Sequence, residues 1–454
     1  MTRPEYPDFS IQRLGEPRIK SPIALGTKEN DGDADFVRDD QRVAYGIEVT
    51  VEEGQRTLHA CGLLEKAGPR EYIYFDPSKV HAGIVTCGGL CPGLNNVIRA
   101  TVMTLWYRYG VRRISGIRYG YRGFLPDLQM PVKELNPEVV SDIHRFGGSV
   151  LGSSRGGGEQ TEAIVDAMEQ MNLSLLFAVG GDGTQRGALR LAQEIARRKN
   201  RMAVVGIPKT IDNDLSFVER SFGFETAVSR AVESVQAAHV EARDAIDGIC
   251  IVKVMGRESG FIAAHTALAT NDVNFVLVPE VPFELEGPNG LLAQLEARMR
   301  TRHHAVIVVA EGAGPNFVSA TGHDASGNKK LGDIGGFLRD RIAKHFADRK
   351  MEVTLRYIDP SYMIRAAPAN PTDAIYCARL GANAVHAAMS GRTSCLVGLV
   401  NHRLVHVPIG LATQHRNRVS VESPLWRDVL ETTGQPALNN IIRASRAPNA
   451  LPPH

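Results

Sequence analysis

Residues 207–214 read IPKTIDND and place one lysine, one threonine and two aspartates within a few positions. They continue the apolar run MAVVGIP, which is typical of a buried strand. Two neighbouring carboxylates can have their pKa values pushed apart, or one can accept a proton while the other orients it or helps to hold a metal ion. The alternative is an Asx-type turn, in which Asp212 and Asp214 bind only backbone amides.

A second polar cluster, VGGDGTQRGA at 179–188, also follows an apolar run and precedes a helical pattern. Its glycines let backbone amides approach a phosphate chain, and Asp182 is a hard oxygen ligand of the kind that Mg²⁺ prefers. The spacing of Gly181, Gly183 and Gly187 also resembles a dinucleotide-binding loop of an oxidoreductase. In a dinucleotide-binding loop, an acid at 182 would repel the pyrophosphate group of the cofactor. The cluster therefore favours a metal–phosphate site over such a loop or a simple packing turn.

The stretch TCGGLCPGLNN, 86–96, is a third glycine-rich turn between an apolar run and a helical pattern. Gly88 and Gly93 have the spacing of the two glycines in a P-loop, but Leu94 and Asn95 stand where lysine and serine or threonine are required. The stretch is therefore no Walker A motif, and a phosphate cradle and a tight packing turn fit it equally well.

Several basic residues follow the other apolar runs. Arg155 lies in LGSSRGGG, Arg257 in VMGRESGF, and both Arg356 and Arg365 in RYIDPSYMIR. Each alone is compatible with a surface arginine, but several at loop positions of one glycine-rich sheet indicate more than one phosphorylated ligand. Glu280, in VPEVPF, is either an acceptor for sugar hydroxyls or a helix-capping acid.

Strands and helices that alternate along the chain must position these clusters. Apolar runs with helical patterns between them predict an α/β fold with a parallel sheet covered on both faces. In such sheets ligands bind at the carboxyl ends of the strands, where the polar clusters fall. The expected strands lie at 80–89, 173–183, 202–210, 249–257, 275–281, 303–314 and 394–400.

Composition limits the remaining possibilities. A chain of 454 residues predicts two domains or lobes, and 43% hydrophobic with 22% charged residues is typical of a globular protein. A net charge of +2 argues against a nucleic-acid partner. Six cysteines form neither a disulfide framework nor a clear zinc pattern. No apolar run reaches membrane-spanning length, so we predict a cytoplasmic protein without a membrane partner.

The motifs GIVTCGGLCPGLN, GGDGT, PKTIDND, MGRESGF, PEVPF and YIDPSYMIR occur in the order found in the 6-phosphofructokinases, between about residues 80 and 415. The chain resembles most the long ATP-dependent group of plants and trypanosomatids. The resemblance implies two similar α/β lobes, each a mainly parallel sheet flanked by helices. The predicted parts are an N-terminal extension at 1–79, a nucleotide-binding lobe at 80–223 plus 364–414, a sugar-phosphate lobe at 224–363 and a C-terminal segment at 415–454.

The resemblance also implies roles for individual residues. Asp212 matches the base that takes the proton from the 1-hydroxyl of the sugar, with Asp214, Thr210 and Arg257 as further catalytic residues, and Asp182 matches the Mg²⁺ ligand. The predicted nucleotide-binding residues are Gly88, Arg155, Gly156, Gly181, Asp182, Gly183, Thr184, Gly187 and Lys209. The predicted sugar-phosphate residues are Thr210, Ile211, Asp212, Met255, Gly256, Arg257, Glu280, Arg356, Tyr362, Met363, Ile364 and Arg365.

The activity implied is transfer of the ATP γ-phosphate to the 1-hydroxyl of fructose 6-phosphate, with Mg²⁺ as cofactor, in an allosteric glycolytic enzyme. The family usually forms tetramers from dimers, so we expect a homo-oligomer, and Arg356 matches a basic residue that often reaches into a neighbouring subunit. Gly248 stands seven residues before Met255, where the short bacterial enzymes have an interface arginine. Tyr362 replaces their histidine, so their effector site cannot be carried over.

Two residues bear on the phosphoryl donor. Pyrophosphate-dependent members resemble one another in an aspartate directly after the metal aspartate and in a lysine before TIDND. Here Gly183 and Lys209 stand at these places, so the two positions conflict. Gly183 leaves room for the α-phosphate of ATP, which favours ATP. The alternatives are a pyrophosphate-dependent phosphofructokinase, an NAD- or lipid-kinase type with GGDGT, and a non-catalytic regulatory subunit.

Overall fold

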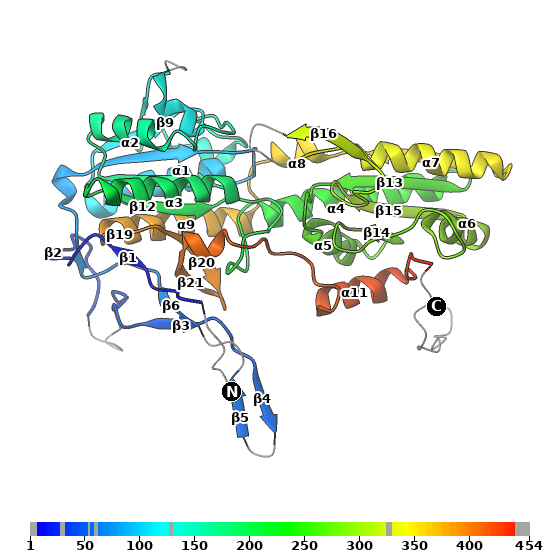
Figure 1. Ribbon diagram of the computed structural model, residues 1–454, viewed down its shortest axis with the longest axis horizontal. Coiled ribbons are helices and arrows are strands. Elements are labelled where there is room, and N and C mark those ends of the chain that lie inside the picture. Colours follow the sequence, from blue (N-terminus) through cyan, green and yellow to red (C-terminus); the bar gives the residue numbers. More distant parts are fainter. Residues whose placement is uncertain are drawn as a thin grey trace. The chain divides into compact units, whose positions relative to one another are not determined.

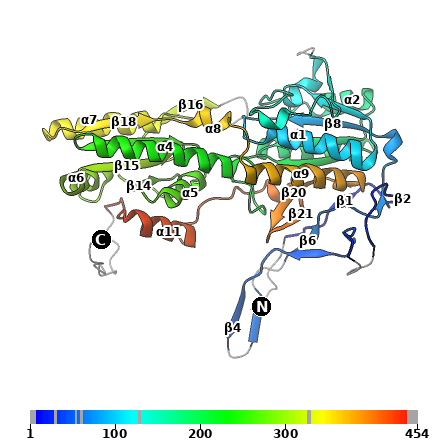
Figure 2. The same cartoon turned by 180° about the vertical axis from the view of Figure 1, so that it is seen from behind.

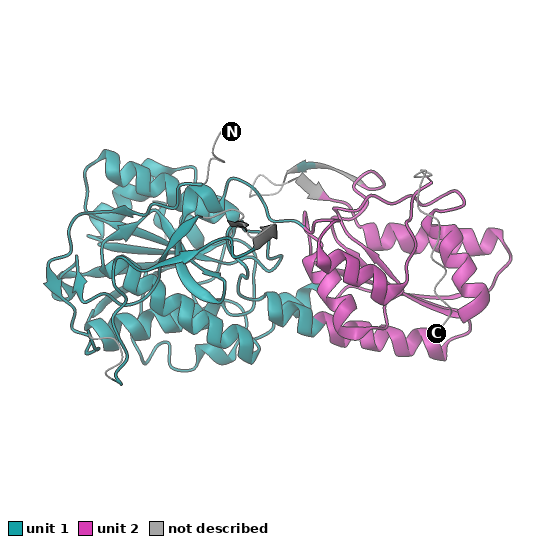
Figure 3. Cartoon of the chain, turned by 90° about the horizontal axis from the view of Figure 1, so that it is seen from below, with its two compact units in different colours: residues 1–230, 321–330, 361–418 teal, residues 231–320, 331–360, 419–454 magenta. Residues whose placement is uncertain are grey.

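The computed structural model, drawn from opposite sides in Figure 1 and Figure 2, describes residues 7–27, 32–52, 55–58, 62–126, 130–323 and 329–440. The chain forms two compact units, coloured separately in Figure 3. The first contains residues 1–230, 321–330 and 361–418, and the second contains 231–320, 331–360 and 419–454. Each unit has helices packed on a sheet that is parallel in its centre or throughout, which confirms the predicted α/β class.

The first unit is built on one large sheet. Its order is β10-β9-β8-β11-β12-β20-β21-β6-β3, parallel from β9 to β20 and antiparallel outside this range. In chain order, its strands are β3 (Arg42–Ala44), β6 (Leu63–Lys66), β8 (His81–Thr86), β9 (Arg113–Ile117), β10 (Lys133–Glu134), β11 (Leu175–Gly180), β12 (Ala203–Pro208), β20 (Cys395–Val400) and β21 (Arg403–Pro408).

Helices cover both faces of this sheet, because successive residues of its buried strands point to opposite sides. Ile84 and Phe177 belong to one apolar cluster, whereas their neighbours Val85 and Ala178 belong to another. Figure 2 shows the helices of the first face in front, and Figure 1 shows those of the second. These are α1 (Leu94–Met103) and α9 (Pro371–Met389) on the first face, and α2 (Thr161–Gln170) and α3 (Asp182–Arg197) on the second.

Strand register brings three polar loops to one edge of this sheet. Val179 of β11 pairs with Thr86 of β8, and Gly180 pairs with Pro208 of β12. The three strands are parallel and end at the same level, so the loops that follow them leave the sheet side by side. This is the edge at which parallel α/β sheets bind ligands.

The second unit has a smaller sheet of order β14-β15-β13-β18 in which every pair is parallel. Its strands are β13 (Gly248–Val254), β14 (Phe275–Leu277), β15 (His304–Ala310) and β18 (Thr354–Ile358). Its helices are α5 (Phe261–Thr270), α6 (Leu291–Arg302), α7 (Ile334–Asp348) and α11 (Pro424–Thr433). Among the helices of the two units, as far as the structure describes them, none is long and apolar enough to cross a membrane.

Further helices and short strands belong to these two units. They are α4 (Phe224–Asp244), α8 (Ser361–Arg365), α10 (Ile409–Ala412), and the short strands β16 (Ser319–His323) and β17 (Lys329–Leu331).

The N-terminal residues are part of the first unit's fold. Besides β3 and β6 in the large sheet, β1 (Gln12–Arg13) pairs with β19 (Arg392–Thr393), β2 (Ile19–Lys20) pairs with β7 (Tyr72–Ile73), and β4 (Val49–Glu52) pairs with β5 (Gln55–Leu58).

Arg392 ties these N-terminal residues to the rest of the unit. Its side chain is only 1% exposed, and its Nε donates to Glu65 Oε2 at 2.6 Å while Nη2 donates to Asp39 Oδ1 at 2.8 Å. Arg70 also donates to Asp39, and Arg13 donates to both acids. We call these five residues the buried ion network after Arg392, Arg70 and Glu65, which are buried, whereas the Arg13 and Asp39 side chains are 31% and 44% exposed. The network joins three N-terminal segments to strand β19.

Candidate active site

The loops after β8, β11 and β12 are held together by backbone hydrogen bonds. The Lys209 amide donates to the Gly180 carbonyl at 3.0 Å, which carries the β11–β12 pairing past the end of the sheet. The Gly88 amide donates to the Ser154 carbonyl at 2.9 Å and thereby fixes the loop that carries Arg155. Three predicted phosphate-binding segments are therefore adjacent, although they lie far apart in the sequence.

Lys209 is the central cation of this edge. Its side chain is buried, and its Nζ donates to the Gly89 carbonyl at 2.7 Å. Burial is the main cause that lowers the pKa of Lys209, and the charges of Arg155 and Arg365 act in the same direction. Gly88 has a φ of +89°, and a Cβ there would lie 3.0 Å from Lys209 Nζ. Glycine therefore serves both the backbone turn and the approach of the ammonium group.

Asp182 opens helix α3, directly after the N-cap residue Gly181. Its side chain is 10% exposed and forms an ion pair with Arg186, while Arg416 Nη2 lies 3.7 Å from its Oδ2. Burial raises the pKa of Asp182, and the nearby Asp214 adds to this, although both arginines oppose it. Burial and a second acid both disfavour the charged form of this carboxylate, and a divalent cation bound there would stabilise that form.

The turn after β12 is locked by Asn213. This residue has a left-handed φ of 56°, and its Oδ1 accepts a hydrogen bond from the Ser221 amide at 2.8 Å. Asp214 accepts a hydrogen bond from Thr210 Oγ1 at 2.5 Å, and Arg416 Nη1 lies 3.9 Å from its Oδ2. In this turn it is therefore the Asn213 side chain that binds a backbone amide in the way expected of an Asx-type turn. Asp214 instead bonds to a side chain of its own loop.

Asp212 and Ile211 occupy the tip of this turn, where both are half-buried. The pKa of the Cys91 thiol depends on several charges of this region, including that of Asp212. Burial raises its pKa far above the usual range, and the charges that act on it are those of Lys209, Asp373, Asp212 and Arg365. The predicted base, the lysine and an arginine of the predicted sugar site are thus all near enough to the Cys91 thiol to affect its pKa.

The residues present fit a magnesium ion, and they do not form an all-protein cage. Within the described ranges, no group of three or more His, Cys, Asp or Glu side chains could hold a metal ion. Mg²⁺ in phosphate-transfer sites is typically bound by one or two carboxylates, with substrate phosphates and water completing its shell. Asp182, with Asp214 close enough to affect its pKa, has this composition.

The glycines of the β11 loop have different surroundings. A Cβ at Gly183 would meet no atom within 4 Å, so open space adjoins this position. A Cβ at Gly187 would lie 2.7 Å from the ring of Tyr121, whose hydroxyl donates to the Thr184 carbonyl at 2.8 Å. Packing alone explains Gly187, and the Thr184 side chain is itself buried. Gly156 has a φ of +79°, which glycine adopts without strain.

In the second unit, the predicted residues 255–257 follow β13. Met255 is fully buried, so it can present only its backbone. Gly256 has a φ of +132°, and its carbonyl accepts a hydrogen bond from the Gly312 amide at 3.0 Å. This turn directs the chain so that Arg257 emerges half-buried at the carboxyl end of the strand.

Glu280 caps backbone groups within the same unit. Its Oε1 accepts hydrogen bonds from the Gly260 amide at 2.9 Å and from the Val419 amide at 2.8 Å. Gly260 is the N-cap residue of helix α5. One oxygen of the Glu280 carboxylate therefore caps backbone amides, which is one of the two roles that the sequence left open.

Two other predicted positions of the second unit lie at its edge strand β18 and beside it. Arg356 is 56% exposed, and its Nε lies 3.9 Å from Glu241 Oε2. A Cβ at Gly248 would lie 2.2 Å from the Ala242 carbonyl oxygen. No side chain fits there without a backbone shift, which explains why an arginine is absent.

The predicted sugar-site residues 362–365 lie on helix α8 of the first unit. Tyr362 and Met363 are 83% and 68% exposed, Ile364 is fully buried, and Arg365 is half-buried. Ile364 therefore packs in the protein, while its neighbours present the side chains available to a ligand.

The first unit thus contains the predicted nucleotide residues, residues 362–365 and all predicted catalytic residues except Arg257, and the second contains 255–257, Glu280 and Arg356. Sequence reasoning missed Arg416 and Arg186, the cations that offset Asp182. Arg186 lies four residues after Asp182 on a helix, a spacing that predicts contact. The only signal for Arg416 was the basic run QHRNR, which is common on protein surfaces.

Comparison with known proteins identifies relatives over nearly the whole chain. The family model described as Phosphofructokinase matches residues 81–388. A Borreliella burgdorferi protein named ATP-dependent 6-phosphofructokinase is 52% identical over 437 residues, which cover 94% of this chain and 97% of that protein. Proteins of the same name from Amycolatopsis methanolica and Trypanosoma cruzi are each 48% identical, over 95% and 82% of this chain and 95% and 76% of their own lengths.

Solved structures share the fold at much lower identity. A pyrophosphate-dependent phosphofructokinase from Marinobacter aquaeolei matches with a TM-score of 0.64 and 20% identity, over 78% of this chain and 91% of that one. A second, from Nitrosospira multiformis, matches with a TM-score of 0.64 and 19% identity, over 83% and 95%. At this identity the similarity concerns the fold alone.

Proposed function

Because the chain belongs to the phosphofructokinase family, we propose that it is an ATP-dependent 6-phosphofructokinase. It transfers the γ-phosphate of ATP to the 1-hydroxyl of fructose 6-phosphate and releases fructose 1,6-bisphosphate and ADP, a step of glycolysis. The observation that carries the proposal is the gathering of Asp182, Asp214 and Lys209 at adjoining strand ends, in a chain whose relatives at 45–52% identity have that name.

Asp212 acts as the general base in this proposal. Its half-buried position at the tip of the turn lets its carboxylate accept the proton of the 1-hydroxyl, which makes that oxygen a better nucleophile. Thr210 and Asp214 stabilise the turn through their mutual hydrogen bond and thereby position Asp212. Arg257 is proposed to offset the charge of the transferring group from the second unit, which we propose binds the sugar phosphate.

Asp182 would hold Mg²⁺ together with phosphate oxygens and water. The ion supplies neutralisation of phosphate charge, which is the main requirement of phosphoryl transfer. The chain's own contribution is the cradle around it: the amides after Gly181, the start of helix α3, and Lys209 with Arg155.

Gly183 supports ATP as the donor. Its Cβ position adjoins open space, so the α-phosphate of ATP has room there. Lys209, the residue shared with pyrophosphate-dependent members, has its ammonium bound to the Gly89 carbonyl. The lysine thus has a role within the loops that is independent of donor choice.

A coupled assay that offers each donor separately tests this proposal. With fructose 6-phosphate and Mg²⁺, we expect kcat/KM with ATP to exceed that with pyrophosphate by at least about 100-fold, a difference of about 2.7 kcal/mol. Higher kcat/KM with pyrophosphate would make the chain the pyrophosphate-dependent enzyme. The absence of turnover with either donor would favour a regulatory subunit.

The assembly and setting of the enzyme are further proposals. We propose a homo-oligomer, either a dimer or a tetramer, in which the exposed Arg356 reaches toward a neighbouring subunit. A cytoplasmic location, which we expect from the sequence, and allosteric regulation, which the family resemblance implies, stay predictions. Size measurement of the purified chain tests the proposed oligomeric state.

A further inference from the structure

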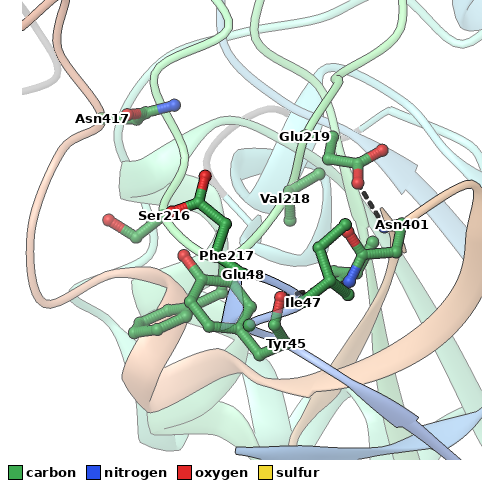
Figure 4. A pocket seen from close by; sticks show the side chains of 11 residues that line it. Tyr45, Ile47, Glu48, Ser216, Phe217, Val218, Glu219, Asn401 and Asn417 are labelled. Atoms are coloured by element: carbon green, nitrogen blue, oxygen red, sulfur yellow. Dashed lines mark hydrogen bonds between the residues drawn. The ribbon is translucent and has the colours of Figure 1, made fainter. Parts of the chain in front are cut away.

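A cavity of about 500 Å³ lies within the first unit, apart from the three strand-end loops (Figure 4). Eleven residues line it, from the segments 45–48, 216–219, 400–401 and position 417. Its volume is within the range of small-molecule sites. None of the roles proposed above uses these residues.

Two aromatic rings form one wall of this cavity, as Figure 4 shows. The rings of Tyr45 and Phe217 lie 5.2 Å apart between centroids, and Phe9 packs edge-on against Phe217 at 5.3 Å. Tyr45 is 39% exposed, and the neighbouring Ile47 is 66% exposed. A flat, apolar group could therefore pack on this wall and remove its surface from water.

Phe217 is held in a strained conformation. Its φ is 59°, in the left-handed region, which costs a bulky residue about 1–2 kcal/mol. Such strain concentrates at ligand sites, where it presents a side chain that a relaxed backbone would not. Here the strained residue contributes the ring shared by both aromatic contacts.

The charged side chains that line the cavity are all acidic. Glu48 and Glu219 are in its lining, and none of the lining residues that the structure describes is lysine, arginine or histidine. Glu219 accepts a hydrogen bond from the Asn401 amide, whereas Glu48 is exposed. A phosphate or carboxylate would be repelled here, while a protonated amine would be attracted to both the carboxylates and the ring faces.

The walls of the cavity are continuous with the turn that carries Asp212. The Asn417 amide donates to the Asp214 carbonyl at 2.9 Å, and Asn213 Nδ2 donates to the Glu219 carbonyl at 3.1 Å. Arg416, adjacent to the lining residue Asn417, is the cation near both Asp182 and Asp214. A ligand that moves either wall would therefore change the surroundings of the proposed metal and catalytic residues.

We propose that this cavity is a second small-molecule site, which binds a flat aromatic ring that carries a protonated amine and which is coupled to the turn at 210–214. The ring packs against Tyr45 and Phe217, and the amine lies toward Glu48 and Glu219. The site goes beyond the proposed phosphoryl transfer, because its ligand is neither the donor nor the sugar phosphate.

Three ligands with one ring system and different charges test the binding directly. Calorimetry or ligand-observed NMR on the full chain would compare tryptamine, the uncharged tryptophol and the anionic indole-3-propionate. We expect tryptamine to bind with a Kd of about 1 mM or tighter, and about three- to fivefold tighter than tryptophol, as is typical of exposed charge pairs. Equal binding of the anion, or no binding of tryptamine at 10 mM, would overturn the proposal.

Variants locate this binding. Glu48→Gln keeps the side-chain length and removes one of the two carboxylates, so it should reduce the preference for tryptamine over tryptophol, whereas Glu138→Gln, at an exposed acid outside the lining, should preserve it. Phe217→Gly relieves the backbone strain and removes the ring, so binding should weaken about tenfold or more while the Tm confirms that the chain is folded. Unchanged binding in both Glu48→Gln and Phe217→Gly would place the ligand elsewhere.

Competition and turnover separate this site from the nucleotide site. Tryptamine should still bind in the presence of saturating ATP, and displacement by ATP would overturn the proposal of a separate site. At saturating tryptamine we expect the KM for ATP or the kcat to change by at least about twofold, which corresponds to a weak allosteric coupling. If both stayed constant, the coupling would be excluded, whereas a chain that binds tryptamine without any turnover would contradict the proposed function alone.

Discussion

In two groups of charged residues in the first unit, the pKa values of the acids are shifted in opposite directions. In the buried ion network, the charges of Arg392, Arg13 and Arg70 outweigh burial and lower the pKa of Asp39 to about 2. At the strand ends, burial outweighs two arginines and raises the pKa of Asp182, while it lowers that of Lys209. The network is complete within the protein, whereas the strand-end charges are the ones that phosphate and Mg²⁺ would complement.

Geometry explains this contrast. Arg392 is enclosed by the Glu65 and Asp39 carboxylates and by Ser390 Oγ, all within hydrogen-bonding distance. Arg416 lies 3.7 and 3.9 Å from Asp182 and Asp214, too far for a good hydrogen bond to either. Removal of one partner from a buried, hydrogen-bonded pair leaves an uncompensated charge, whereas the longer contacts of Arg416 with the two acids leave room for an additional charged ligand.

Removal of the proposed base should have the largest effect on activity. We expect Asp212→Asn to lower kcat about 10²–10⁴-fold, the range for loss of a general base, with fructose 6-phosphate binding and Tm nearly unchanged. Steady-state kinetics and calorimetry measure the two parts. Asp340→Asn, at a side chain 70% exposed on α7, is the control and should keep full activity. Full turnover by Asp212→Asn would exclude it as the base.

Damage to the buried ion network should affect stability and spare the chemistry. Glu65→Ala leaves Arg392 without its closest partner, so we expect the free energy of unfolding to fall by about 3–5 kcal/mol, as for other broken buried pairs. Denaturant titration measures this loss. Glu162→Ala, at a side chain 78% exposed, should cost less than about 0.5 kcal/mol. If Glu65→Ala unfolded like the control, the network would have no structural role.

Gly183→Asp tests the open space beside the β11 loop. The new carboxylate would lie where the α-phosphate of ATP is proposed to bind, so we expect the KM for ATP to rise about 10–100-fold. Gly183→Ala should alter it little, because a Cβ there meets no atom within 4 Å. An unchanged KM for ATP in Gly183→Asp would contradict the steric basis of donor choice.

The smallest effect concerns pH. Burial lowers the pKa of His406, beside Glu65, from 6.5 to about 4. The unfolded chain therefore binds the proton more readily, so the stability from the neutral imidazole is present above pH 6.5 and is lost as the pH falls toward 4. Thermal unfolding from pH 7.5 to 4 should show a falling Tm with a smaller slope in His406→Gln. An identical slope in both proteins would show that His406 does not titrate in this way.

Much of the site followed from the sequence, because strand ends are marked by local patterns. Apolar runs that stop at GGDGT and PKTIDND placed Asp182 and Asp212 at the ends of β11 and β12, and the parallel register then brought the loops together. Gly183 was expected to leave space, and the structure has that space.

The remaining features depend on residues that are distant in sequence. Arg392 and Glu65 are 327 positions apart, and neither carries a local signal that predicts their contact. The same holds for Arg416, whose approach to Asp182 depends on the path of residues 409–418. Packing against Tyr121 accounts for Gly187, although spacing alone suggested a ligand loop. Long-range contacts of this kind are specified by the whole fold.

The identity of the product tests the proposed function most directly. ³¹P NMR of fructose 6-phosphate incubated with the chain, ATP and Mg²⁺ should show ADP and a sugar phosphorylated at carbons 1 and 6 in equal amounts. Asp212→Asn at the same concentration should form this product at least about 100-fold more slowly. Hydrolysis of ATP without the bisphosphate, or phosphorylation at another carbon, would contradict the assignment.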